Sequence, residues 1–140
     1  MFRKIMIAVD VEHEQFSEKA VQVALEIGGQ TENVVYQMIA VIQPVGAGFV
    51  SSFLPKDYDK KIAEKAKAAL KSFTKKHFPE GVQVKHIVAM GTIYEEINRI
   101  AREQNSELVI VASSKPNTKG LGPNAARVAR YCDKPVLIIR

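Results

Sequence analysis

Short, uninterrupted apolar runs recur along this chain and alternate with amphipathic stretches. Residues 5–9 read Ile-Met-Ile-Ala-Val, and residues 108–112 read Leu-Val-Ile-Val-Ala. Runs of this length without polar alternation are typical of strands that are covered on both faces, as in parallel sheets. Strands that alternate with helices predict a parallel sheet whose connections are right-handed crossovers. All-helical and all-β folds are excluded, because the apolar runs lie between amphipathic helices.

The expected elements alternate from strand to helix along the whole chain. Strands are predicted over residues 5–9, 34–42, 82–88, 108–112 and 135–139. Helices are predicted over residues 17–28, 57–77 and 125–131, and a further helix is predicted to start at Thr92. Ser17 is the expected N-cap of the first helix, and Thr92 with Glu95 has the spacing of a capping box. No linker or internal repeat interrupts the pattern, so we expect one domain over residues 1–140.

The composition fits a globular chain with a small anionic ligand. The sequence has 140 residues, of which 46% are hydrophobic and 25% charged, and its net charge is +5. A chain of this length buries a sizeable core without disulfides or a structural metal. The basic residues are scattered and no aromatic side chains are interleaved with them, so nucleic-acid binding is not expected.

Neither a disulfide nor a membrane segment is expected. Cys132 is the single cysteine, which excludes an internal disulfide and a cysteine-based zinc site. The chain opens with a strand pattern rather than an apolar signal region, and no apolar run is long enough to span a bilayer. The sequence therefore predicts a cytoplasmic protein.

A polar loop near the C-terminus predicts a phosphate-bearing ligand. Residues 113–121 are rich in Ser, Lys, Asn, Thr and Gly, and they lie between the strand at 108–112 and the next helix. In an open parallel sheet, anionic ligands collect at this place, because unpaired backbone N–H groups and the helix dipole favour negative charge.

At four places the sequence resembles the universal stress protein family. Three of them are Ile-Met-Ile-Ala-Val-Asp at residues 5–10, Ser17-x-x-Ala20, and Met90-Gly91 before a helix. The fourth and most specific is the closing segment, which runs from Gly122-Pro123-Asn124-Ala125-Ala126-Arg127-Val128-Ala129-Arg130 through Pro135-Val136-Leu137-Ile138-Ile139. The likeness covers the chain from end to end, and the loop resembles a subgroup whose nucleotide-binding loop lacks the usual glycines.

The resemblance implies a doubly wound α/β fold. It implies a five-stranded parallel sheet in the order 3-2-1-4-5, with helices on both faces. It also implies a homodimer, often formed by pairing of the exposed last strand, here Val136–Ile139. Many members bind ATP in the crevice where the strand order reverses, between the first and fourth strands, and others bind no nucleotide.

Asp10 is the expected contact to the sugar of a nucleotide. It follows the first strand, beside the expected crevice. A carboxylate there accepts hydrogen bonds from ribose hydroxyls, as the acidic residue of dinucleotide folds does. The alternative is that Asp10 only begins the turn into the next segment.

The expected contacts to the base are apolar. The resemblance implies that the backbone of Val41 faces the adenine ring, and that Ala8 and Val9 line the base pocket. Met90 and Gly91 would close the site at the end of the third strand. All of these residues would also serve as core or turn residues in a protein without a ligand.

The phosphate loop departs from the family's nucleotide-binding motif, which is Gly-x2-Gly-x9-Gly-Ser/Thr. Ala112 replaces the first glycine and Lys115 the second, Gly122 matches the third, and Pro123 replaces the Ser/Thr. The stretch before Gly122 is also a few residues shorter than in the full motif. Because proline has neither an N–H nor a hydroxyl, two donors to a phosphate are lost.

Other groups in this segment are candidates to replace the lost donors. The N–H groups of Asn124 and Ala125 remain at the helix start, Ser113 is a further candidate contact, and Lys115 and Lys119 bring positive charge. We expect triphosphate binding to be weaker than in members with the complete motif. The alternative is that both lysines are solvated and Gly122 only precedes the helix.

No catalytic or metal-binding group of residues is apparent. His13, His77 and His86 lie on separate elements and have no metal-ligand spacing to Asp, Glu or Cys. An enzyme and a tightly bound metal are therefore not expected. The first hypothesis is a regulatory stress-response protein that binds ATP or AMP, with Mg²⁺ accompanying ATP, and acts on an unidentified protein partner. The second is a dimeric protein-interaction module that binds no nucleotide.

Overall fold

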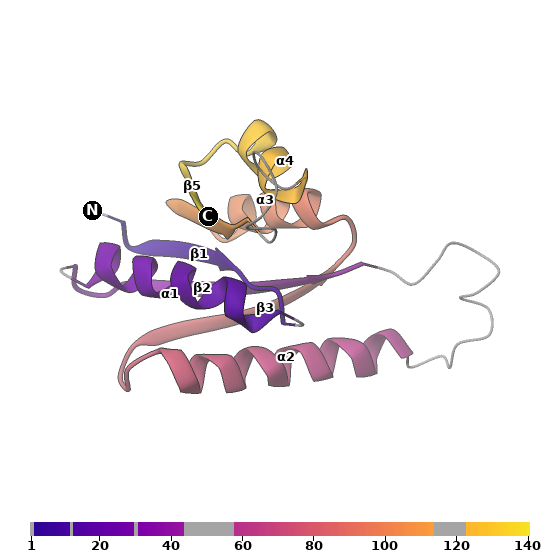
Figure 1. The fold of residues 1–140 in the computed structure, drawn as a ribbon, viewed down its shortest axis with the longest axis horizontal. Helices are drawn as coiled ribbons and strands as arrows, with labels where there is room; N and C mark the ends of the chain where they lie inside the picture. The colour runs from indigo at the N-terminus through magenta and orange to yellow at the C-terminus, as the bar shows by residue number, and fades with distance from the viewer. Residues whose placement is uncertain (1, 12, 30, 44–57, 114–122) are drawn as a thin grey trace.

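The computed structural model describes residues 2–11, 13–29, 31–43, 58–113 and 123–140. Strands and helices alternate throughout, as the sequence predicts (Figure 1). The elements are β1 (Lys4–Ala8), α1 (Glu14–Gly28), β2 (Val35–Ile42), α2 (Tyr58–His77), β3 (Gln83–Met90), α3 (Ile93–Glu103), β4 (Leu108–Ala112), α4 (Pro123–Tyr131) and β5 (Val136–Ile139).

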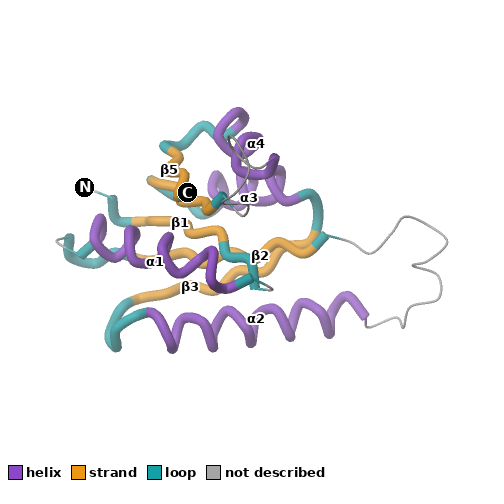
Figure 2. Tube along the Cα trace, in the orientation of Figure 1, coloured by secondary structure: helices purple, strands orange, loops and turns teal. Residues whose placement is uncertain are grey.

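The five strands form one parallel sheet in the order β3-β2-β1-β4-β5. This confirms the strand order that the family resemblance implies. β1 lies at the centre, and β3 and β5 are the two edge strands. In the tube of Figure 2, α2 lies on one side of the strands, and α3 with α4 lies on the other.

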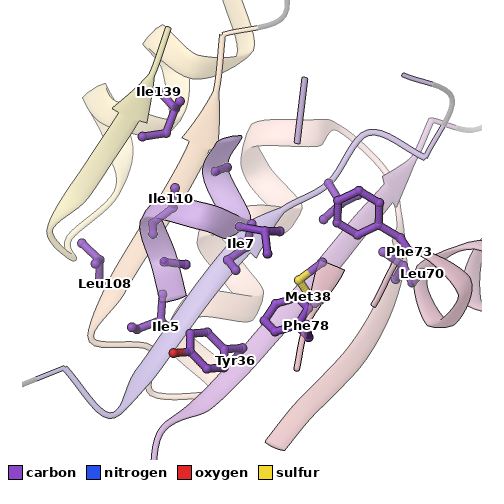
Figure 3. Packing of buried hydrophobic residues seen from close by; sticks show 14 of the residues in the cluster. Ile5, Ile7, Tyr36, Met38, Leu70, Phe73, Phe78, Leu108, Ile110 and Ile139 are labelled. Atoms are coloured by element: carbon purple, nitrogen blue, oxygen red, sulfur yellow. The ribbon is translucent and has the colours of Figure 1, made fainter. Parts of the chain in front are cut away.

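Two apolar clusters, one on each face of the sheet, explain the uninterrupted runs in the sequence. Ile5 and Ile7 of β1 share one cluster with Leu70 and Phe73 of α2, and residues of α1 complete it (Figure 3). Met6, between the two isoleucines, points to the opposite face and joins the cluster formed with α3 and α4. Because successive side chains of a strand point to opposite faces, a strand covered on both sides needs apolar residues at every position.

The first helix begins earlier than the sequence predicts. α1 starts at Glu14, and His13 occupies the N-cap position without a side-chain capping hydrogen bond. Ser17 is 1% exposed, and its Oγ accepts a hydrogen bond from the Asp10 N–H at 3.2 Å. The predicted N-cap role of Ser17 is therefore wrong, because its hydroxyl pairs with the chain that follows β1 rather than with the first amides of the helix.

The third helix starts where the sequence predicts, but without the predicted capping box. Thr92 is the N-cap of α3, and its side chain makes no capping hydrogen bond. The Glu95 carboxylate instead accepts a hydrogen bond from the Tyr94 hydroxyl, at 3.2 Å. The spacing of Thr92 and Glu95 located the helix start correctly. The predicted capping hydrogen bonds are wrong, because the Glu95 carboxylate pairs with the hydroxyl of Tyr94 instead.

The last helix begins at Pro123, two positions before its predicted start. Proline suits this first helical position, because its missing N–H would have no partner there. None of the helices among the described residues has the length and apolar character needed to cross a membrane.

Asn98 is a buried polar residue of α3 whose removal should stabilise the fold. It is 7% exposed, and its Oδ1 has no hydrogen-bond partner among the described residues. An unmet buried carbonyl costs about 1 kcal/mol or more of folding free energy. We predict that Asn98→Leu, which is similar in size, raises the free energy of unfolding in urea by about 1 kcal/mol. Asn98→Ala is the control, since it removes the same carbonyl but leaves a void; a destabilised Asn98→Leu would contradict the prediction.

His86 should make the stability of the fold depend on pH. Its Nε2 lies 2.8 Å from Thr74 Oγ1 of α2. Burial, followed by the charges of Lys71 and Lys67, lowers the pKa of His86 below its ordinary value of 6.5. The folded protein therefore holds a neutral ring while the unfolded chain takes up a proton near that value. The resulting stability is present above pH 6.5 and is lost as the pH falls below it.

The change that tests this is His86→Gln, which keeps a hydrogen-bonding partner for Thr74 but does not titrate. We predict that urea unfolding of the original protein loses more free energy between about pH 7.5 and about pH 5.5 than unfolding of the variant does. Equal losses in the two proteins would show that His86 does not contribute.

Candidate functional site

The central strands β1 and β4 separate at their carboxyl ends. β1 pairs with β4 only as far as Ile7 opposite Ile110, whereas it continues beside β2 to Ala8 opposite Ile39. The Val9 N–H then donates to the Ile39 carbonyl at 2.8 Å, so the chain still follows β2. The end of β4 pairs with β5 instead. A crevice results at the point where the strand order reverses, which is the usual ligand site of open α/β sheets.

A cavity of about 810 Å³ occupies this crevice. Its floor is made by the ends of β1, β2 and β4, and residues of α1, α2, α3 and α4 line its sides. Small side chains leave the space open, since six alanines line it: Ala8, Ala40, Ala66, Ala69, Ala112 and Ala125. The volume is within the range of about 300–1,000 Å³ that is typical of small-molecule sites.

Most of the sequence-predicted site residues meet at this cavity. Seven of the eleven line it: Ala8, Val9, Asp10, Val41, Ala112, Asn124 and Ala125. Lys115 and Gly122, like Lys119, lie outside the residues that the structure describes. Met90 and Ser113 are described but are not among the lining residues.

Met90 and Ser113 both take part in the hydrogen bonding of the sheet. Met90 is the last residue of β3 and pairs with Ile42. Gly91 follows at φ 148°, and its N–H donates to the Ile42 carbonyl at 2.9 Å. Ser113 is 9% exposed, and its N–H donates to the Ile139 carbonyl at 2.7 Å. The Ser113 amide is therefore engaged by β5.

Asp10 lies at the edge of the cavity, and Ser17 and His13 are among the residues that hold it there. Its N–H donates to Ser17 Oγ, and its Oδ2 lies 3.0 Å from Nδ1 of His13. The His13 ring also lies against Phe16, with ring centroids 5.8 Å apart. The Asp10 side chain remains 46% exposed. These contacts fix the position of a carboxylate that is still accessible to a ligand.

Helix α2 contributes cavity residues that the sequence analysis missed. Tyr58, Ile62, Lys65, Ala66 and Ala69 line the cavity. Ile62, Ala66 and Ala69 have the spacing of one apolar face of the helix, and this part of the face lines the cavity. Lys65 is three residues after Ile62 and so shares that flank of the helix, a spacing that could have drawn attention to it.

The lining combines apolar, anionic, cationic and neutral polar groups. Apolar and small side chains form the floor, Asp10 supplies a carboxylate, and Lys65 and Asn124 supply a cation and an amide. Such a lining is suited to a ligand with a flat apolar ring, hydroxyl groups and an anionic end. Within the described part of the chain, no three His, Cys, Asp or Glu side chains are grouped closely enough to hold a metal ion.

Known proteins resemble this chain over its whole length. The sequence model of the Universal stress protein family matches residues 1–140. Universal stress protein G of Shigella flexneri is 27% identical over 145 residues, which cover 100% of both chains. Among solved structures, protein MJ0577 of Methanocaldococcus jannaschii has a TM-score of 0.82 and 26% identity, over 99% of this chain and 96% of its own.

A more distant structure has the same fold and contains a nucleotide. The universal stress protein of Archaeoglobus fulgidus in complex with dAMP has a TM-score of 0.63 and 16% identity. The match covers 99% of this chain and 98% of the other. At this identity the likeness shows the fold alone.

Proposed function

Because the chain belongs to the universal stress protein family, we propose that its crevice binds an adenine nucleotide, ATP or AMP. In this proposal the protein is a regulatory component of a cytoplasmic stress response rather than an enzyme, and Mg²⁺ accompanies ATP. The observation that carries the proposal is the open cavity where β1 and β4 separate. Seven of the eleven predicted site residues line it, and they include residues expected near the base, the sugar and the phosphates.

The apolar floor is suited to the adenine ring. Ala8 and Val9 follow the path of β1, and Val41 lies near the end of β2. The ring would lie on these side chains, and exposed backbone groups at the strand ends would meet its polar edge. Burial of a flat, mostly apolar ring is favourable by roughly 25 cal/mol for each Å² removed from water.

Asp10 is the proposed partner of the ribose. Its half-exposed carboxylate stands at the end of β1, where a sugar bound beside the base would lie. His13 fixes the side chain at 3.0 Å, so the carboxylate loses little freedom when a hydroxyl donates to it. Hydrogen bonds to a charged group contribute about 1.5–3 kcal/mol each.

The start of α4 is the proposed position of the first phosphate. Asn124 and Ala125 line the cavity in the first turn of this helix. The first amides of a helix have no partner within the helix, and the dipole favours negative charge there. Pro123 contributes no N–H, which leaves fewer donors than a serine or threonine would. The cation of Lys65, also on the cavity wall, adds attraction for an anion.

The dAMP-bound relative is consistent with this proposal, because it has the same fold. We further propose that the cavity binds the nucleotide but does not catalyse a reaction on it. Ser17, a hydroxyl on the cavity wall, accepts the Asp10 N–H and is held by that bond.

Replacement of Asp10 tests the sugar contact. We predict that Asp10→Asn weakens the affinities for ATP and AMP about tenfold, measured by isothermal titration calorimetry, because the amide is a poorer acceptor. The original protein should bind 2′,3′-dideoxy-ATP about tenfold more weakly than ATP, and the variant should distinguish the two much less. The control is Asp133→Asn, which removes the same charge from an exposed pair with Arg102.

Two results would contradict the proposal. If the original protein binds neither ATP nor AMP at about 1 mM, nucleotide binding itself is wrong. If Asp10→Asn and Asp133→Asn bind alike, the assigned role of Asp10 is wrong.

A second candidate function is a dimeric interaction module. β5 is an edge strand of the sheet, and Val136, Leu137 and Ile138 are half-buried rather than covered. An edge strand with apolar side chains is a template for pairing with another strand. We propose that β5 pairs with β5 of a second copy, whether or not the cavity is filled.

A lysine in β5 tests this pairing. In a two-fold antiparallel pair centred on the middle of β5, Leu137 lies close to its own copy, so like charges at this position would face one another. We predict that Leu137→Lys converts a dimer to a monomer in sedimentation equilibrium, while thermal unfolding monitors the fold. The control is Val84→Lys on the opposite edge strand, β3. Like Leu137, Val84 is partly buried and packs against the apolar cluster that contains Ile5 and Ile7. An unchanged mass for Leu137→Lys, or a monomeric original protein, would contradict the prediction.

A further inference from the structure

Four side chains form a row on the surface of α3 and α4. The Arg127 guanidinium lies 5.9 Å from the centre of the Tyr94 ring. The Tyr94 ring lies 5.5 Å from the Tyr131 ring at an angle of 31°, and the Arg130 guanidinium lies 5.5 Å from the Tyr131 ring. We call this set the Arg–Tyr row. Tyr131 is 56% exposed, which is unusual among the large rings of the described residues.

The two arginines of the row differ from those of α3. Arg99 is held by the carboxylates of Glu96 and Glu103, each at 2.7 Å, and both raise the pKa of Arg99. In the part of the chain that the structure describes, Arg127 and Arg130 have no carboxylate within 4.0 Å. A guanidinium that lies on an aromatic face without a counter-charge keeps its N–H donors for a ligand.

Neither arginine is among the residues that line the cavity, and Arg127 is the nearer of the two to Asn124 along α4. It lies one helical turn after Asn124, which lines the cavity, and its partner Tyr94 directly follows Ile93, which lines it as well. Side chains of a helix lean toward its N-terminus, so Arg127 covers the turn that carries Asn124. Arg130 lies further along α4, over Tyr131 near the end of the helix.

From this geometry we infer that Arg127, held in place by Tyr94, binds the terminal phosphate of a nucleotide whose base occupies the cavity. This inference rests on the proposed function and names the part of the ligand that the site selects. A planar guanidinium donates two parallel N–H groups to a phosphate, which a solvated lysine does not do. In this protein Arg127 replaces donors that are missing from the start of α4, where Pro123 has no N–H.

Glu95 is the opposing charge at this place. Its carboxylate accepts the Tyr94 hydroxyl at 3.2 Å, so it lies beside the ring on which Arg127 rests. A carboxylate there repels a phosphate, and its neutralisation should strengthen binding. The neighbouring Glu96 is held by Arg99 and is already compensated.

The test is a titration of adenosine, AMP and ATP into the original protein and into three variants. We expect Arg127→Gln to weaken ATP binding about tenfold and to leave adenosine binding unchanged. The matched control is Arg130→Gln, which removes the same charge from the same helix and the same kind of ring contact, and should change neither affinity by more than about twofold. Glu95→Gln should bind ATP more tightly and adenosine as before.

The outcomes separate the inference from the function on which it rests. If the original protein binds none of the three compounds, the proposed function is wrong and this inference with it. If it binds ATP but Arg127→Gln is no weaker than Arg130→Gln, the inference alone is wrong. If Arg127→Gln weakens adenosine as much as ATP, the residue maintains the cavity rather than contacting phosphate, and the inference is also wrong.

Discussion

The reversal of strand order at β1 is the constraint on which the rest of this structure depends. From β1 the chain moves outward through β2 to β3, and after α3 it crosses to the other side of β1 to form β4 and β5. Because each crossover is right-handed, movement in opposite directions puts the helices on opposite faces. The chain therefore leaves β1 toward one face and leaves β4 toward the other. In the part of the chain that the structure describes, the cavity lies between their ends.

What occupies the strand ends decides whether that space stays open. The middle of β1 and β4 carries large side chains such as Ile7 and Ile110, which are completely buried. At their carboxyl ends the same strands carry Ala8 and Ala112, and α2 and α4 add further alanines at facing positions. On β1, the buried Ile7 is followed directly by Ala8, which lines the cavity. The stability of the fold and the volume of the site thus come from adjacent positions on the same strands.

Sequence reasoning predicted the elements, the family and the lining residues at the strand ends, such as Ala8, Val41 and Ala112, because these depend on local pattern and on strand ends that meet at one edge of a parallel sheet. It was wrong about Ser17, whose residue type favours an N-cap but whose hydroxyl pairs with Asp10 in the folded chain. A contact of this kind decides the helix start and is not visible in local propensity. The capping box at Thr92 failed for a similar reason, since Glu95 has a closer partner in Tyr94.

The contact between Arg127 and Tyr94, on which the proposed phosphate site depends, could not have been predicted from spacing. Arg127 and Tyr94 are far apart in the sequence, and only the packing of α4 against α3 brings them together. The spacing of Lys65 from Ile62 places both on one flank of α2, but only the packing of α2 against the sheet places that flank at the cavity. Residue types and periodicity predict the strands and helices of such a protein. Contacts between side chains of different helices and strands can be identified only in the folded structure.

The most direct test of the nucleotide site is a two-dimensional amide NMR spectrum of the protein with and without AMP. We predict that the largest changes in chemical shift fall on the ends of β1 and β2 and on the first turn of α4, at residues such as Asp10, Val41 and Asn124. Amides of β5 should remain unchanged. Spectra that do not change at several millimolar AMP, or changes centred on β5 or on the outer face of α2, would contradict it.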